Sequence, residues 1–199
     1  MDYREQHKLR LAYMPWLYHR LKPAHAEWAR AWQTELQAEL AELETVEFGK
    51  NVFIAPQARL FAEPGRPIII GDGSTIAADS VLHGPIRLGC NVSINHHATL
   101  DGGRKGITVG NDTRIAAHAT LFAFNHGMAA GSLIREQAVD SEGITIGQDV
   151  WIGAQAGIVD GVCVGDGAVI GMNSQVTQNV AAQTVVAGNP AREIKKRSP

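Results

Sequence analysis

The sequence predicts a mainly β solenoid preceded by a short helical segment. From residue 48 onward a large apolar residue returns at every sixth position, giving about eighteen hexads. A short fixed period implies stacked units that bury one continuous core. The large positions are Phe48, Ile54, Leu60, Ile70, Ile76, Leu82, Leu88, Ile94, Leu100, Val109, Ile115, Leu121, Ile146, Ile152, Ile158, Val164, Ile170 and Val176.

A second, smaller residue in most hexads supports the same prediction. The position four residues after the large one is usually small or β-branched, so each hexad offers one large and one small inward side chain. Glycines and asparagines between them suit tight corners. The small positions are Ala58, Ser74, Ser80, Val92, Ala98, Thr113, Ala119, Val150, Ala156, Val162, Ala168 and Ser174.

Residues 1–45 have a helical period instead and are expected to form a separate N-terminal segment. Apolar and charged residues are mixed between Arg4 and Leu21, and Pro15 should kink or divide a helix there. Pro23 suits the first turn of a second helix. We expect the apolar stripe of that helix to pack on the rest of the domain, not to bind a cofactor or partner. The stripe comprises Trp28, Trp32, Leu36, Leu40 and Leu43.

Composition excludes several classes of function. The 199 residues, 45% of them hydrophobic, can bury the core of one ordinary domain. A net charge of −2 argues against a nucleic-acid partner. Cys90 and Cys163 lie in different repeats, without the spacing of a zinc site or disulfide framework. The charged start MDYREQHKLR and the absence of any long apolar run predict a cytoplasmic protein without membrane insertion.

The hexad period breaks at three places, and the third break is the informative one. Four extra residues fall near Pro64, three near Gly102, and nineteen between Leu121 and Ile146. Binding and catalytic residues concentrate on such long loops. The loop 122–143 carries Asn125-His126-Gly127 near its start.

The repeat and two longer segments resemble a known family. ITIGQDVWIGAQAGIVDGVCVGDGAVIG (144–171) and VVAGNPAREI (185–194) are similar to the left-handed β-helix hexapeptide acyltransferases. Within that family they look most like the maltose, galactoside, nodulation-factor and polysaccharide O-acetyltransferases. The resemblance covers about residues 46–197. It implies a left-handed parallel β-helix over 46–199 with an extended catalytic loop and a basic C-terminal tail, a homotrimer, and acetyl-CoA as co-substrate with no required metal.

The resemblance also implies a catalytic histidine at His126. Moving an acyl group from a thioester to a hydroxyl requires removing the hydroxyl proton, and an imidazole with a pKa near 6.5 can accept it at neutral pH. Asn95 matches a substrate-contacting asparagine of the family, although a simple turn asparagine is the alternative. Asn125, beside the histidine, is a candidate for acceptor binding.

Further candidates in the loop and the adjoining coil are less sharply defined. Either Glu136 or Glu142 is expected to orient the imidazole or bind sugar hydroxyls. Trp151 matches an aromatic residue at the family's acceptor cleft, with packing as the alternative.

For the donor, the resemblance implies a site along the last coils. Ala154, Gly171, Met172 and Thr177 match positions beside the pantetheine arm, and Gln178 stands where relatives commonly have lysine. Cationic side chains near the C-terminus would then hold the nucleotide phosphates, with a solvated basic tail as the alternative. These cations are Arg192, Lys195, Lys196 and Arg197.

The sequence therefore predicts an acetyl-CoA-dependent O-acetyltransferase that acts on a sugar or polysaccharide precursor. An amino-sugar N-acetyltransferase remains open. A γ-type carbonic anhydrase is a competitor because His97, His118 and His126 could converge on a metal, although their spacing does not match that family. A noncatalytic β-helix assembly subunit is the other competitor, and it leaves the loop unexplained.

Overall fold

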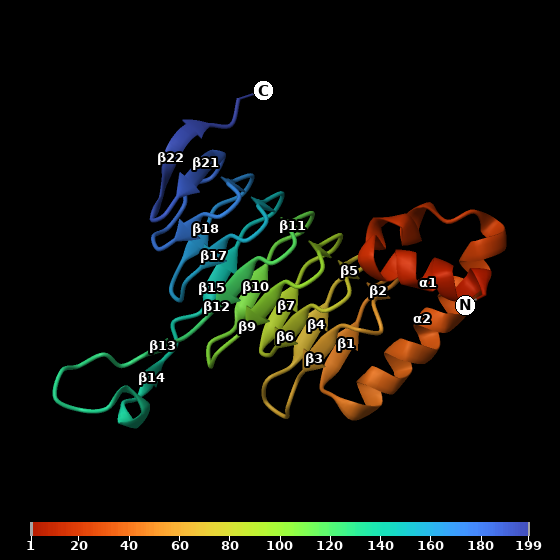
Figure 1. Cartoon of the computed structure of the whole chain (residues 1–199), viewed down its shortest axis with the longest axis horizontal. Coiled ribbons are helices and arrows are strands. Elements are labelled where there is room, and N and C mark those ends of the chain that lie inside the picture. The colour runs from red at the N-terminus through yellow and green to blue at the C-terminus, as the bar shows by residue number, and fades with distance from the viewer. Residues whose placement is uncertain (1, 199) are drawn as a thin grey trace.

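The chain forms a parallel β-helix with helices at its N-terminal end and a strand hairpin at its C-terminal end (Figure 1). The computed structural model describes residues 2–198. Helices α1 (Tyr3–Tyr13) and α2 (Pro23–Leu43) flank a 3₁₀ helix, η1 (Pro15–Arg20). The predicted division of the first helix at Pro15 is confirmed.

Three sheets, parallel except for β22 (Ala191–Lys196), form the three faces of the β-helix. The first face contains β1 (Val46–Phe48), β4 (Ile68–Ile70), β7 (Ile86–Leu88), β10 (Ile107–Val109), β15 (Ile144–Ile146) and β18 (Cys163–Val164). The second contains β2 (Phe53–Ile54), β5 (Thr75–Ile76), β8 (Ser93–Ile94), β11 (Arg114–Ile115), β16 (Trp151–Ile152), β19 (Val169–Ile170), β21 (Thr184–Gly188) and β22 (Ala191–Lys196). The third contains β3 (Arg59–Phe61), β6 (Val81–His83), β9 (Thr99–Asp101), β12 (Thr120–Phe122), β17 (Gly157–Ile158) and β20 (Gln175–Val176).

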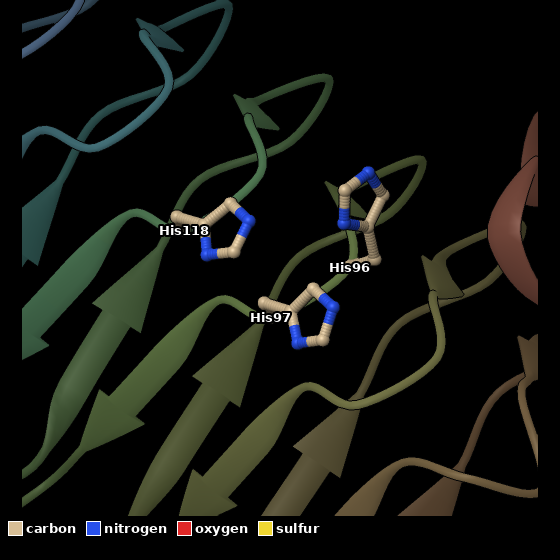
Figure 2. A group of neighbouring side chains, drawn as sticks. All are labelled: His96, His97 and His118. Atoms are coloured by element: carbon tan, nitrogen blue, oxygen red, sulfur yellow. The ribbon is translucent and has the colours of Figure 1, made fainter.

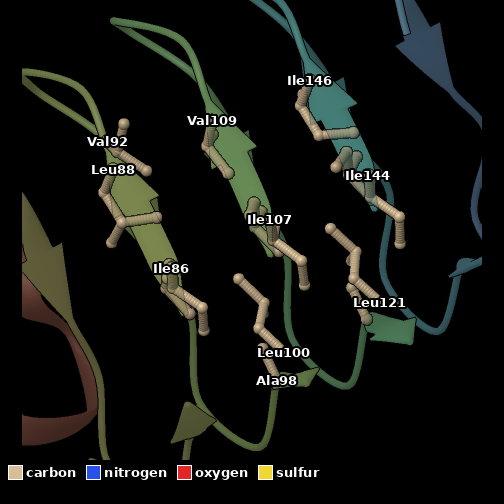
Figure 3. Close-up of a cluster of buried hydrophobic side chains, with 14 of the residues drawn as sticks. Ile86, Leu88, Val92, Ala98, Leu100, Ile107, Val109, Leu121, Ile144 and Ile146 are labelled. Atoms are coloured by element: carbon tan, nitrogen blue, oxygen red, sulfur yellow. The ribbon is translucent and has the colours of Figure 1, made fainter. Parts of the chain in front are cut away.

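The core is the column of side chains that the hexads predict. Seventeen of the eighteen large positions are buried, and only Phe48 is partly exposed. All twelve small positions are buried as well. Successive coils place like residues in register, as where Ile107 pairs with Ile86 on one side and Ile144 on the other (Figure 3). The prediction of a mainly β solenoid is confirmed.

Corners between the second and third faces form a regular ladder, which we call the second–third edge. Its third position has a left-handed backbone with φ between +59° and +60° in five coils. Asn, Asp and His are the non-glycine residues that tolerate this conformation best. Residues at this position therefore recur one above another along the edge: Asp79, His97, His118, Gln155 and Asn173.

Helix α2 covers the N-terminal end of the β-helix. Leu36 and Leu40 pack against the core, while Trp28 and Trp32 pack on a smaller cluster around Phe53, as expected. The expectation for Leu43 was wrong, because this side chain is 73% exposed. The buried side of α2 is centred on Ala29 and Gln33 and turns Leu43 outward.

Strand β22 lies at the opposite end, on the second face. It pairs antiparallel with β21, with an irregularity at Val185/Val186. The segment expected to be a basic tail is therefore mostly a strand. Lys196 Nζ donates to Thr184 Oγ1 at 2.8 Å, and Arg197 forms an ion pair with Asp149 at 2.9 Å.

Candidate active site

All three insertions leave the β-helix at the same edge, between the third and first faces. They follow β3, β9 and β12 and occupy residues 62–67, 102–106 and 123–143. We call this the third–first edge. Because these strands are neighbours in one sheet except for the intervening β6, the insertions lie close together along the edge.

The three insertions together line a cavity of about 540 Å³. Its wall combines cationic, anionic and apolar side chains. None of these lining side chains was predicted, because the hexad breaks pointed to the third insertion and within it to His126. The residues that define its chemistry are Arg66, His83, Asp101, Arg104, Phe124 and Val139.

A charged network fixes one wall of the cavity. His83 Nδ1 lies 3.1 Å from Asp101 and its Nε2 lies 3.4 Å from Glu63. Arg66 Nε donates to the carbonyl oxygen of Gly84 at 2.8 Å. The pKa of Glu63 is lowered, first by its own backbone amide and then by His83. The wall therefore presents ordered donors and acceptors.

Ser141 fixes the base of the long loop. Its Oγ donates to the carbonyl oxygen of Ala123 at 2.6 Å and accepts from the amides of Arg104 and Lys105, each at 3.0 Å. Gly103 has a φ of +53°, and a Cβ there would collide with the Ala123 carbonyl oxygen. The second insertion is thus tied to the base of the third.

His126 lies on a hairpin that projects from this base. Strand β13 (Asn125–His126) pairs antiparallel with β14 (Val139–Asp140), and the hairpin extends away from the β-helix (Figure 1). His126 is directly opposite Val139, so the two side chains share a face of the hairpin. The ring centroids of His126 and Phe124 are 6.1 Å apart. Val139 and Phe124 both line the cavity, and the exposed His126 lies next to them on the hairpin without being a lining residue itself.

The tip of the loop is held by Gln137, not by a glutamate. Gln137 accepts from the amide of Ala129 at 2.8 Å and donates to the carbonyl of Ser132 at 3.2 Å. Glu136 lies in the 3₁₀ helix η2 (Ile134–Glu136), exposed and 3.8 Å from Arg135. Glu142 is exposed at the base of the loop, where its amide donates to Asp160. Neither glutamate forms a hydrogen bond with His126 in the part of the chain that the structure describes.

The other predicted site residues fall on two different edges of the molecule. Asn95 directly follows β8 at the second–third edge, and its Nδ2 donates to the carbonyl of Ile115 at 3.2 Å. Residues at or beside the second–third edge are Asn95, Trp151, Ala154, Gly171 and Met172. Residues at the third–first edge are Asn125, His126, Glu142, Thr177 and Gln178.

The donor cations predicted near the C-terminus differ in their contacts. Arg192 and Lys195 are exposed on β22. Lys196 and Arg197 are engaged with Thr184 and Asp149 within the chain. Arg192 and Lys195 are therefore the better placed pair for a ligand.

Three other histidines form a compact cluster at the second–third edge. The donor nitrogens of His96, His97 and His118 all lie within 4.8 Å of one another (Figure 2). Burial, and then the neighbouring His97 and His118, lower the pKa of His96. His126 does not belong to this cluster, so the set of His97, His118 and His126 considered for a carbonic anhydrase is not brought together in the described chain.

Comparison with known proteins places this geometry in a family. Residues 143–178 match the hexapeptide repeat of succinyl-transferase. WbbJ of Escherichia coli K12, named as a lipopolysaccharide biosynthesis O-acetyl transferase, is 31% identical over 132 residues, which cover 62% of this chain and 67% of WbbJ. The galactoside O-acetyltransferase of the same organism is 31% identical over 147 residues, covering 74% of this chain and 66% of that enzyme. The chain belongs to the hexapeptide-repeat acyltransferases, in the branch that the sequence resembles.

A solved structure supports the same assignment. AntD, an N-acyltransferase from Bacillus cereus in complex with dTDP and 3-hydroxybutyryl-CoA, has a TM-score of 0.72 and 27% identity over 81% of this chain and 88% of its own. Matches to chloramphenicol acetyltransferases, such as that of Morganella morganii, are 54% identical but span only 52 residues, 25% of that enzyme. The segment most similar in sequence is thus shared by enzymes with different acceptors. Among residues 2–198, no helix has the length and apolar character needed to cross a membrane.

Proposed function

We propose that this protein transfers an acetyl group from acetyl-CoA to a hydroxyl of a sugar or polysaccharide precursor, with His126 as the general base. The observation that carries the proposal is that Phe124 and Val139, the neighbours of His126 on its hairpin, line a cavity built by all three insertions. WbbJ and the galactoside enzyme are O-acetyltransferases by name, which favours a hydroxyl acceptor.

The chemistry needs one proton transfer in each direction. As the acceptor oxygen attacks the thioester carbonyl, the His126 imidazole takes the hydroxyl proton. The tetrahedral intermediate collapses, the carbon–sulfur bond breaks, and the imidazolium returns the proton to the departing thiolate. The products are an acetyl ester and free CoA, and no acyl-enzyme is formed.

The division of the site residues between two edges supports a shared active site. In one chain, Asn95 and His126 lie on different edges. A homotrimer in which the second–third edge of one chain faces the third–first edge of the next would bring them into one cleft. The same contact would place Ala154, Gly171 and Met172 of one chain opposite Thr177 and Gln178 of its neighbour, around the pantetheine arm. We therefore propose a cyclic homotrimer acting in the cytoplasm.

The test is CoA release from acetyl-CoA with a panel of sugars, oligosaccharides and amino sugars, followed by His126→Ala. We expect the variant to lose about two to four orders of magnitude in kcat, the usual weight of a positioned general base. Its CoA affinity and circular dichroism should match those of the parent protein, since His126 is exposed on a projecting hairpin.

Turnover near the parent level in His126→Ala would remove this residue from the mechanism. Absence of CoA binding in the parent protein would instead favour a noncatalytic assembly subunit. Preference for amino sugars would place the enzyme with N-acyltransferases such as AntD.

A further inference from the structure

The regular stacking of corners at the second–third edge brings the three histidines of the cluster together. His97 and His118 occupy the same left-handed corner position in neighbouring coils, and their rings stack with centroids 4.8 Å apart at an interplanar angle of 13°. His96 precedes His97 and turns its ring toward the pair, 5.3 Å from His97 and 5.8 Å from His118 (Figure 2). Two adjacent coils thus supply three imidazoles to one point.

His96 carries a second observation. Its Nδ1 is buried and has no hydrogen-bond partner within residues 2–198. Buried polar atoms are nearly always paired, so an unpaired nitrogen needs an explanation. A ligand held between the three rings would supply one.

Asp79 lies at the next corner of the same ladder and adds a carboxylate. Its Oδ2 is 3.8 Å from His97 Nε2 and accepts a hydrogen bond from the Tyr13 hydroxyl at 2.8 Å. A carboxylate beside a ligating histidine commonly orients the ring and raises its basicity. At 3.8 Å the two groups are not hydrogen-bonded, so His97 would have to move closer for Asp79 to take that role.

We propose that His96, His97 and His118 bind one divalent transition-metal ion, such as Zn²⁺, at the second–third edge. Neutral imidazole is the commonest protein ligand for such ions. Tetrahedral zinc with Zn–N bonds of about 2.0–2.1 Å holds its ligand nitrogens roughly 3.3 Å apart, so the cluster must contract by about 1.5 Å. His97 and His118 are exposed and can turn without disturbing the core.

Within one chain the site uses a different edge from the proposed catalytic base and different histidines, and nothing in the acetyl-transfer chemistry above requires it. In the proposed trimer this edge, which also carries Asn95, faces His126 of the neighbouring chain, so metal binding and acetyl transfer are measured separately. A stacked imidazole ladder that binds no ion is the competing explanation, and it predicts no metal uptake.

The experiment measures Zn²⁺ and Co²⁺ binding to the full, tag-free chain by calorimetry and elemental analysis after dialysis. We expect one ion per chain, and a Co²⁺ visible spectrum typical of nitrogen ligation in a site of low coordination number. His97→Asn and His118→Asn are the matched variants, because Asn173 adopts the same backbone conformation with a φ of +59°. Each should weaken binding by at least about tenfold, since even the loss of an outer partner costs that much.

Two further variants make the assignment specific. His96→Gln should also weaken binding, whereas His126→Asn should leave affinity and stoichiometry unchanged. Loss of binding in His126→Asn with retention in His96→Gln would overturn the proposal in favour of a set that includes the loop histidine. Failure of the parent chain to retain Zn²⁺ or Co²⁺ would overturn it outright.

Discussion

A buried glutamine side chain pairs with the backbone of the first coil at the N-terminal end of the β-helix, beside Gln37, which donates to the carbonyl oxygen of Val52. Gln33 accepts from the amide of Ile54 at 2.8 Å and donates to the carbonyl oxygen of the same residue at 2.9 Å. It is only 2% exposed. β2 is the first strand of its sheet and has no strand beyond it, so Gln33 provides the pairing that a further coil would otherwise give.

We expect Gln33→Ala to destabilise the protein, because it leaves both groups of Ile54 unpaired inside the structure. The free energy of unfolding should fall by about 1–3 kcal/mol for each group that water does not reach. Urea denaturation followed by circular dichroism measures the change. Thr34→Ala, at an exposed position of the same helix, is the control and should stay within about 0.5 kcal/mol of the parent. Equal stability of the two variants would contradict this role.

Gln33 also shows why the contacts of helix α2 could be predicted only in part from the sequence. An apolar stripe predicts which side of a helix packs on a core, and it correctly indicated Trp28, Trp32, Leu36 and Leu40. A polar residue that is buried because it pairs with a strand end leaves no mark in that pattern.

At the scale of elements, the sequence predicted the three insertions, but it did not predict that they line one cavity. Their lengths follow from the hexad count alone. The fact that all three share one edge follows only when hexads are counted in threes, since Leu60, Leu100 and Leu121 all belong to the third face. The hydrogen bonds of Ser141 that join two insertions depend on loop conformation, and the hexad pattern carries no information about them.

Strand β22 supplies a prediction about the donor. Arg192 and Lys195 are exposed there, whereas Lys196 is engaged by Thr184 and Glu193. Arg192→Ala combined with Lys195→Ala should raise the KM for acetyl-CoA about three- to tenfold, through loss of contacts with phosphate. The KM for the acceptor should be nearly unchanged, and Lys196→Ala should have the smaller effect.

Acetyl-pantetheine separates phosphate contact from an indirect effect of this double variant. It lacks the nucleotide, so the parent and the double variant should use it equally well. An equal loss with both donors would show that β22 acts on the donor site through its packing.

At the scale of the whole molecule, the proposed trimer predicts that two inactive variants can restore activity when their chains are mixed. If Asn95→Ala and His126→Ala are each severely impaired, unfolding them together and refolding at equal ratio should give mixed trimers with some intact clefts. With random assembly, about half of the clefts receive an intact His126 from one chain, and about half receive an intact Asn95 from the other. Because the two chains are chosen independently, about a quarter of the clefts contain both residues, which gives about a quarter of the parent activity.

Mass spectrometry must establish the mixed trimers before the activity is interpreted. Their CoA release is then compared with that of each variant refolded alone. Recovery no greater than the mean of the two variants would show that a single chain holds both residues of each cleft.

The covered ends of the β-helix have a consequence for how the protein avoids self-association. Nothing in a stack of parallel coils limits the number of coils. The outer side of the last coil exposes backbone amides and carbonyls like those with which each earlier coil pairs with the next. An uncovered end would therefore template end-to-end growth into a fibre. Helix α2 pairs with the first coil through Gln33, and on the second face the antiparallel strand β22 occupies the place where a further parallel coil would pair. These two segments thus oppose end-to-end stacking of one chain on another.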